Sequence, residues 1–137
     1  MSKSPSEIVL QGMYANDAFS QWMGMEVVDV QLQSATVRMT VRSEMTNGFG
    51  IAHGGITYSL ADSTFAFACN SEGVQAVSVE TSISHLARVS AGDILTAKAT
   101  LVQRSRKIGR YAVQVYNQKE ELVADFKGTC YYTAIEY

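Results

Sequence analysis

Residues 56–71 constrain the fold of this chain more than any other stretch. They form an apolar segment long enough for about four helical turns. Apolar side chains cover most of the circumference of the predicted helix: Ile56, Leu60, Ala61, Phe65, Ala66, Phe67, Ala68 and Cys69. A helix of this kind has to be covered by other elements on nearly every side. The rest of the chain must therefore provide a surface that wraps around a helix.

Alternating apolar and polar residues predict about six strands in the rest of the chain. The first two are expected at 28–32 and 35–41, joined by a tight turn at Gln33 and Ser34. In the third, Val77, Val79 and Ile83 are expected on one face. The remaining strands are expected near 77–86, 95–101, 111–115 and 122–132, with turns at 92–93 and 117–120.

These elements predict one α+β domain over residues 1–137, with residues 1–6 disordered. A short amphipathic helix is expected within 7–22, interrupted near Gly12 and ended at Gly24. The strands form a curved antiparallel sheet wrapped around the long helix. Since one sheet cannot cover that helix on all sides, a second copy of the chain is expected to close the open flank. The sequence thus predicts a dimer at least.

Composition excludes several classes of function. The chain has 47% hydrophobic and 18% charged residues and a formal net charge of −2. This charge gives no general attraction to nucleic acid or anionic membranes. No apolar run approaches the roughly 20 residues of a membrane span, and the N-terminus lacks a signal sequence, so a cytoplasmic protein is expected. Cys69 and Cys130 are predicted to be small buried hydrophobes. No metal or cofactor is expected.

Four glycines within eight residues precede the long helix: Gly48, Gly50, Gly54 and Gly55. Glycines let a loop bring its backbone N–H groups close to a ligand. The first N–H groups of a helix lack internal partners, and the helix dipole is positive at that end. The segment can therefore bind an anion or stabilise an oxyanion. The alternative is that the glycines only turn the chain.

Asp62 is the one formally charged residue between Glu44 and Glu72. It shares a small polar stripe of the predicted helix with Ser59, Ser63, Ala66 and Asn70, either as part of a solvated face or as the lining of a cleft. Gly54 and Asp62 lie about 12 Å apart along a helix. In two antiparallel helices related by a two-fold axis, Gly54 of one chain meets Asp62 of the other. This predicts an active site that spans a dimer interface.

Two histidines and a basic turn have both structural and functional interpretations. His53 precedes the glycine pair, and His85 lies within a predicted strand; most isolated histidines are structural. Arg104, Arg106, Lys107 and Arg110 supply four of the eleven Lys and Arg residues within one strand-to-strand turn. The turn is either a solvated hairpin or a clamp for phosphate groups.

The motif Asn47-Gly48, His53-Gly54-Gly55, Leu60-Ala61-Asp62 and 68–71 resembles the hot-dog-fold acyl-CoA thioesterases of the phenylacetate-degradation (PaaI) type. The resemblance covers most of the chain. It implies a curved sheet around a central helix, dimers and commonly homotetramers, and CoA thioesters of aromatic or medium-size acids as substrates. Relatives often have proline where this chain has Val89.

The resemblance also implies roles for individual residues. Asp62 is the catalytic carboxylate, as nucleophile or general base. The Gly54 amide binds the thioester oxygen, Asn47 orients the water or the carbonyl, and His53 supports the loop. Gly55 and the basic turn of Arg104, Arg106, Lys107 and Arg110 are expected to bind substrate.

Two other functions remain open from the sequence. A hot-dog acyl-CoA hydratase or dehydratase needs an acid and a base close together, and His53 lies nine residues from Asp62. A non-catalytic acyl-CoA-binding module would bind the thioester without turnover.

Overall fold

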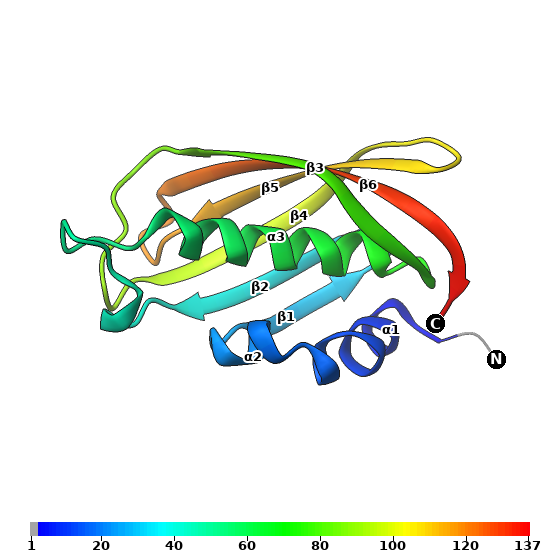
Figure 1. Ribbon diagram of the computed structural model, residues 1–137, viewed down its shortest axis with the longest axis horizontal. Helices are drawn as coiled ribbons and strands as arrows, with labels where there is room; N and C mark the ends of the chain where they lie inside the picture. Colours follow the sequence, from blue (N-terminus) through cyan, green and yellow to red (C-terminus); the bar gives the residue numbers. More distant parts are fainter. Residues whose placement is uncertain (1–2) are drawn as a thin grey trace.

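A single antiparallel sheet of six strands curves around one long helix, α3 (Gly54–Asn70), in the computed structural model, which describes residues 3–137 (Figure 1). The strand order is β1-β2-β4-β5-β6-β3. The strands are β1 (Glu26–Gln31), β2 (Ser34–Thr40), β3 (Val74–His85), β4 (Ile94–Arg104), β5 (Ile108–Tyr116) and β6 (Leu122–Glu136). The predicted α+β architecture is confirmed, including the long helix between the second and third strands.

The core lies between α3 and the concave face of the sheet. Leu60, Phe65 and Phe67 of α3 are almost completely buried, as are the alternate residues of the strands that face them. Close packing depends on Gly128 of β6, because a Cβ atom there would lie 2.8 Å from the Phe65 ring. Glycine thus lets the backbone of the sheet approach the centre of the helix.

The N-terminal segment covers one flank of α3 (Figure 1). It comprises α1 (Pro5–Gly12), η1 (Tyr14–Asn16), which is a short 3-10 helix, and α2 (Ala18–Trp22). The Tyr14 ring packs edge-on against Phe67 at 6.2 Å, and the Tyr14 hydroxyl donates to the Met25 carbonyl at 2.6 Å. The predicted interruption near Gly12 is confirmed.

The expectation that residues 1–6 are disordered needs correction. Met1 and Ser2 lie outside the described residues, but α1 begins at Pro5. The Ser4 side chain caps this helix by accepting a hydrogen bond from the Glu7 amide at 3.1 Å. A serine cap followed by proline in the first turn is a strong start signal for a helix, which the prediction overlooked.

Strand β3 lies at the edge of the sheet and pairs only with β6. Its register shifts between Ser78 and Glu80, so the faces of the strand are exchanged there. The prediction that Val77 and Ile83 share a face is therefore wrong: Ile83 packs against the core, whereas Val77 is 51% exposed. Val79 is 57% exposed. The result is a long edge strand with exposed valines, which is the kind of edge that pairs with another chain.

None of the helices within residues 3–137 has the length and apolar character needed to cross a lipid bilayer.

Candidate active site

Asp62 lies in the middle of α3, on the side that the sheet does not cover. Its carboxylate makes no hydrogen bond or ion pair within residues 3–137. Burial alone raises the pKa of Asp62 above its ordinary value. The neighbouring Ser63 is bonded to Ser20 of α2 at 2.9 Å, so the N-terminal segment packs directly beside the acid. A partly buried carboxylate without a partner does not stabilise the fold, and this makes it a candidate for chemistry.

The N-terminus of α3 offers the Gly54 amide as a donor to a ligand. His53 is the N-cap residue, and its Nδ1 atom accepts a hydrogen bond from the Gly55 amide at 2.8 Å. The Ile56 amide donates to the His53 carbonyl at 2.9 Å. The Gly54 amide has no acceptor among residues 3–137. Of the two glycines predicted to bind substrate, only Gly54 has its N–H group free.

Asn47 is fixed by the loop that leads into α3. Its Oδ1 atom accepts hydrogen bonds from the amides of Phe49 at 2.9 Å and Ile51 at 3.4 Å. The Nδ2 atom of the amide group remains available as a donor. Asn47 and Gly54 both line a hollow of about 180 Å³ at the start of the helix, together with Thr57, His85 and Arg88.

Asp62 does not line this hollow. It lies two turns further along α3. At the helical rise of about 1.5 Å per residue, this places it about 12 Å from Gly54. The structure thus brings three of the four predicted catalytic residues together (Asn47, His53 and Gly54). It leaves the acid and the amide of one chain too far apart to contact the same carbonyl group.

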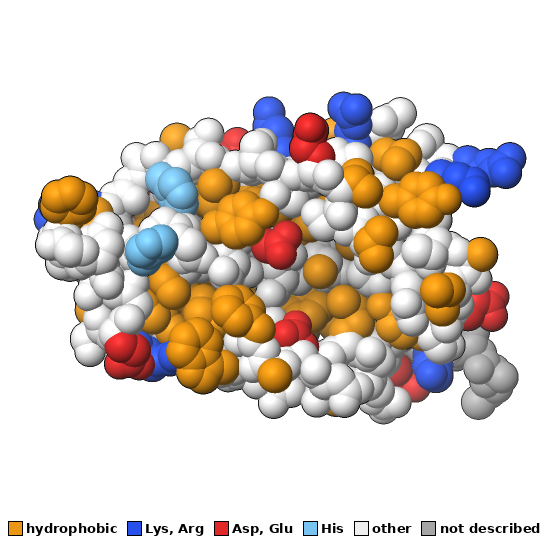
Figure 2. All heavy atoms as spheres, in the orientation of Figure 1, with side chains coloured by type: hydrophobic (Ala, Val, Ile, Leu, Met, Phe, Trp, Pro, Cys, Tyr) orange, Lys and Arg blue, Asp and Glu red, His pale blue; other side chains and the backbone are white. Residues whose placement is uncertain are grey.

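His85 lies at the site, although no role there was predicted for it from the sequence. It ends β3 and lies against Gly54, and both histidines appear side by side at the end of the molecule where α3 begins (Figure 2). The alternation along β3 could have placed it next to the helix. The register shift at Ser78 and Glu80 does not affect this, because it lies before Ile83 and His85. What the sequence lacks is the packing of the end of β3 against the start of α3, which only the fold shows.

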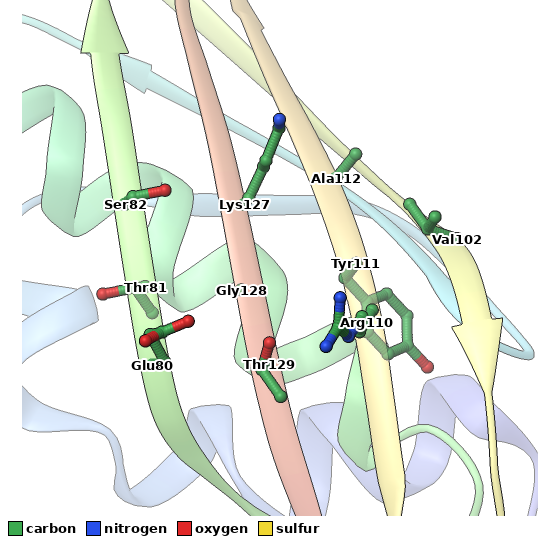
Figure 3. Close-up of a pocket in the computed structure, with 10 residues that line it drawn as sticks. All are labelled: Glu80, Thr81, Ser82, Val102, Arg110, Tyr111, Ala112, Lys127, Gly128 and Thr129. Atoms are coloured by element: carbon green, nitrogen blue, oxygen red, sulfur yellow. The ribbon is translucent and has the colours of Figure 1, made fainter.

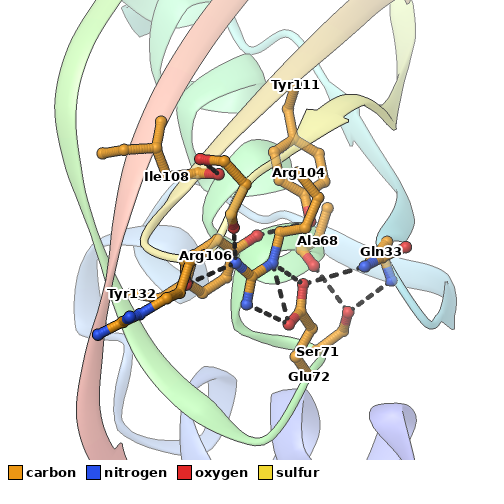
Figure 4. A network of polar contacts seen from close by, with 10 residues as sticks. Gln33, Ala68, Ser71, Glu72, Arg104, Arg106, Ile108, Tyr111 and Tyr132 are labelled. Carbon is orange, nitrogen blue, oxygen red and sulfur yellow. Dashed lines mark hydrogen bonds and ion pairs between the residues drawn. The ribbon is translucent and has the colours of Figure 1, made fainter.

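The basic turn does not form one cationic cluster. Arg104 is paired with Glu72 at 2.9 Å and lies 3.5 Å from the centre of the Tyr132 ring (Figure 4). Arg106 and Lys107 line a hollow of about 360 Å³ next to Tyr132, and Arg104 lies at the same hollow. The donors of Arg104 are therefore used mainly inside the protein, whereas Arg106 and Lys107 face a surface hollow.

Arg110 faces another region, the outer side of the sheet. It lines a hollow of about 360 Å³ that crosses strands β3 to β6 (Figure 3). Lys127 and Glu80 also line this hollow, with Ser82 and Thr129 between them. None of the three charged side chains takes part in an ion pair within the described residues.

No three His, Cys, Asp or Glu side chains come together as metal ligands anywhere in residues 3–137. Cys69 and Cys130 are free thiols buried in the core, as predicted.

Comparison with known proteins identifies the family. Residues 49–124 match the sequence profile of the Thioesterase superfamily. The chain belongs to this superfamily. It is 40% identical over 116 residues to the acyl-coenzyme A thioesterase PaaI of Escherichia coli, a match that covers 85% of this chain and 83% of the relative. The predicted relationship to PaaI-type thioesterases is therefore confirmed, and the chain is a thioester hydrolase by family.

Solved structures of similar proteins share the fold. The E. coli PaaI protein superimposes with a TM-score of 0.93 at 36% identity, covering 96% of each chain. A Streptococcus mutans protein, solved with acetyl-CoA bound, superimposes with a TM-score of 0.79 at 27% identity, covering 82% of this chain and 91% of that protein. The predicted hot-dog fold is confirmed.

Proposed function

We propose that this thioesterase hydrolyses CoA thioesters of aromatic or medium-size acids to the free acid and CoA. One observation carries the proposal: an unpaired carboxylate lies on an apolar helix whose first amide is also unpaired. The E. coli relative named acyl-coenzyme A thioesterase and the S. mutans structure with acetyl-CoA support CoA as the thiol half of the substrate.

The thioester oxygen accepts a hydrogen bond from the Gly54 amide, where the positive end of the helix dipole stabilises negative charge on that oxygen. Asp62 then either attacks the carbonyl carbon, forming a mixed anhydride, or removes a proton from water. In both routes the C–S bond breaks and CoA leaves as the thiolate. Water supplies the hydroxyl group of the acid and the proton of the released thiol. Asn47 orients the water or the carbonyl through its free Nδ2 group, and His53 holds the loop.

The complete site is shared between two chains. A second copy that pairs along the β3 edge covers Val77 and Val79, which are exposed in the single chain. With the two α3 helices antiparallel across the two-fold axis, Gly54 of one chain lies opposite Asp62 of the other. The helical rise separates these two residues by roughly 12 Å within one chain, which supports this arrangement. We further propose that two dimers associate as a homotetramer.

Cationic residues of the basic turn bind the phosphates of CoA. Arg106, Lys107 and Arg110 form no ion pair within residues 3–137 and line surface hollows, although Lys107 also donates to the Tyr131 hydroxyl at 3.4 Å. Arg104 holds the turn in position through Glu72. Gly55 keeps space for the imidazole of the capping histidine, because a Cβ atom at this position would lie 3.0 Å from Nδ1 of that ring. A cytoplasmic location is supported by the two free thiols, which suit a reducing compartment.

A screen of acyl-CoAs tests the proposal. Release of free thiol is measured with short-chain, aromatic and long-chain acyl-CoAs, and the fastest turnover is expected with aromatic or medium-size acyl groups. An enoyl-CoA in the same screen separates hydrolysis from hydration, because hydration removes the enoyl absorbance without releasing thiol. Binding of acyl-CoA without thiol release from any substrate would contradict the proposed activity.

A further inference from the structure

His85 lies on the helix-facing side of β3. Its cross-strand partner is Ala124, a buried residue of β6. Four residues earlier, Thr81 faces the same side, since its hydroxyl is hydrogen-bonded to the Tyr58 hydroxyl of α3 at 2.5 Å. Because side chains alternate along a strand, positions 81, 83 and 85 all face α3. The last of them reaches the start of the helix.

The imidazole of His85 is aimed at the backbone of Gly54. Its Nε2 atom lies 3.2 Å from the point that a Cβ atom of Gly54 would occupy, closer than any other atom of the ring. The ring also lines the hollow that contains Asn47 and Gly54. Neither ring nitrogen has a hydrogen-bond partner within residues 3–137. This polar edge therefore faces the proposed position of the thioester oxygen without being used by the fold.

The donors at this position are few. An oxygen that becomes an oxyanion in the transition state is stabilised best by more than one fixed donor. The Gly55 amide, which could have been the second donor, already donates to His53. Of the two glycine amides, only that of Gly54 is free. A second donor has to come from a side chain. The free Nδ2 group of Asn47 lines the same hollow, and Nε2 of His85 is the side-chain donor that lies beside Gly54.

We propose that His85 donates a hydrogen bond from Nε2 to the thioester oxygen, as the second donor beside the Gly54 amide. This role rests on the proposed hydrolysis of acyl-CoA. The imidazole keeps its proton throughout, so no proton transfer is assigned to it. Because charge builds up on the oxygen only as the tetrahedral intermediate forms, the hydrogen bond strengthens in the transition state. His85 therefore affects kcat more than KM.

Two substitutions separate a donor from a packing residue. His85→Phe keeps an aromatic ring against Gly54 but removes the N–H group, and His85→Gln keeps an N–H donor at similar reach. We expect kcat to fall about 10- to 100-fold in His85→Phe, with KM changed less than about threefold, and His85→Gln to recover most of the loss. Ser84→Ala, on the opposite face of β3, is the matched control and keeps wild-type kcat. A His85→Phe enzyme with wild-type kcat would overturn the proposal.

An infrared measurement reads the same contact without turnover. Asp62→Asn is expected to bind acyl-CoA without hydrolysing it, so a thioester labelled with ¹³C at the carbonyl can be observed while bound. Adding His85→Phe is expected to shift the carbonyl stretch to higher frequency, and adding His85→Gln to restore it. If the stretch is the same in all three proteins, His85 is not a donor, whatever the kinetics show. Failure of acyl-CoA hydrolysis itself is seen separately, as absence of thiol release by the unsubstituted enzyme.

Discussion

The two ends of α3 differ in how fully their polar groups are used. At the C-terminal end, the Asn70 side chain donates to the carbonyls of Ala66 and Ala76 at 2.9 and 3.2 Å and accepts from the Ala76 amide at 2.8 Å. The Ser71 hydroxyl donates to the Ala68 carbonyl and accepts from the Gln33 amide, both at 2.7 Å. The contacts with Ala76 and Gln33 tie the helix to its surroundings, and those with Ala66 and Ala68 close its own last turn.

Further toward the N-terminal end, the corresponding groups are left free. The Gly54 amide, the Asp62 carboxylate and the His85 imidazole have no partners within residues 3–137. One helix therefore combines a C-terminal end whose hydrogen bonds stabilise the fold with free polar groups at its first residue, at its midpoint and on the strand beside its start. The difference separates structural from functional polar residues, and the predictions below test whether it does so correctly.

The largest effect is expected for the free carboxylate. Asp62→Asn should reduce kcat at least about 100-fold, because it removes the nucleophile or base. The fold should be retained, since the carboxylate makes no contact that holds the structure together. Steady-state kinetics and circular dichroism measure the two properties. Near-normal turnover of this variant would remove Asp62 from the mechanism. It would also show that a free polar group on α3 is not necessarily a functional one.

The next effect concerns the cationic side chains of the basic turn that form no ion pair within residues 3–137. Replacing Arg106, Lys107 and Arg110 with Gln should raise KM for an acyl-CoA about tenfold, because charge-assisted contacts to phosphate are lost. KM for the matching acyl-pantetheine, which lacks the nucleotide, should not change. Arg38→Gln, at an exposed cation of β2, is the control. Equal changes with both substrates would show that the basic turn does not bind the phosphates.

Substitutions near the C-terminal end of α3 should change the stability of the protein and leave catalysis unchanged. Glu72→Ala leaves the Arg104 guanidinium without its partner, and the side chains of this pair are only 16% and 27% exposed. The free energy of unfolding should fall by about 1–3 kcal/mol, with kcat unchanged at a temperature where the variant is folded. Urea denaturation measures the loss.

Glu26→Ala is the matched control for that change. It breaks the ion pair of Glu26 with Arg38, whose side chains are 63% and 46% exposed. Because solvent screens such an exposed pair, its loss should lower the free energy of unfolding by no more than about 0.5 kcal/mol. If both substitutions lower the free energy of unfolding equally, the ion pair near the C-terminal end of α3 does not contribute more to stability than an exposed pair.

The smallest effect is a pH-dependent gain in stability for Asp62→Asn. Burial raises the pKa of Asp62 in the folded state, so the ionised form destabilises the folded protein relative to the unfolded chain. Asparagine removes this cost, and Tm at pH 7 should rise by about 1–4 °C. The gain should shrink as the pH falls toward about 4, where the carboxyl group becomes protonated in both states. A Tm difference that stays constant with pH would assign the gain to another cause.

Periodicity was sufficient to predict the helix, six strands and their order along the chain, because these depend on local patterns of apolar residues. The face of β3 could not be predicted, since the register shift at Ser78 and Glu80 depends on pairing with β6. The closeness of His85 to Gly54 could not be predicted either, because it depends on how the end of β3 packs against the start of α3. The ion pair between Arg104 and Glu72 could not be predicted from the sequence either, because the two residues are 32 positions apart and only the fold brings them together.

The composite site was predicted from spacing and stays a prediction: within one chain, Gly54 begins α3 and Asp62 lies two turns further along. The use of the Gly55 amide by His53 was not foreseen. A glycine pair at a helix start suggests two free donors, but the histidine ring accepts from one of them. Such local competition between side chain and ligand depends on a rotamer, which a sequence does not specify.

Mixed dimers test the shared site most directly. Gly54→Pro removes the one free amide at the first helical position, where proline is tolerated, and His53 already has the extended backbone suited to a residue before proline. Gly54→Ala keeps the amide but adds a Cβ atom 3.2 Å from Nε2 of His85, so it measures the effect of the added carbon separately from the loss of the amide. Asp62→Asn and Gly54→Pro chains are co-expressed with different affinity tags, and the heterodimers are purified through both tags. Each homodimer should be inactive, whereas the heterodimer contains one intact site and should recover about half of the wild-type activity. Inactive heterodimers, purified as folded dimers, would contradict the claim that Gly54 and Asp62 act across the interface.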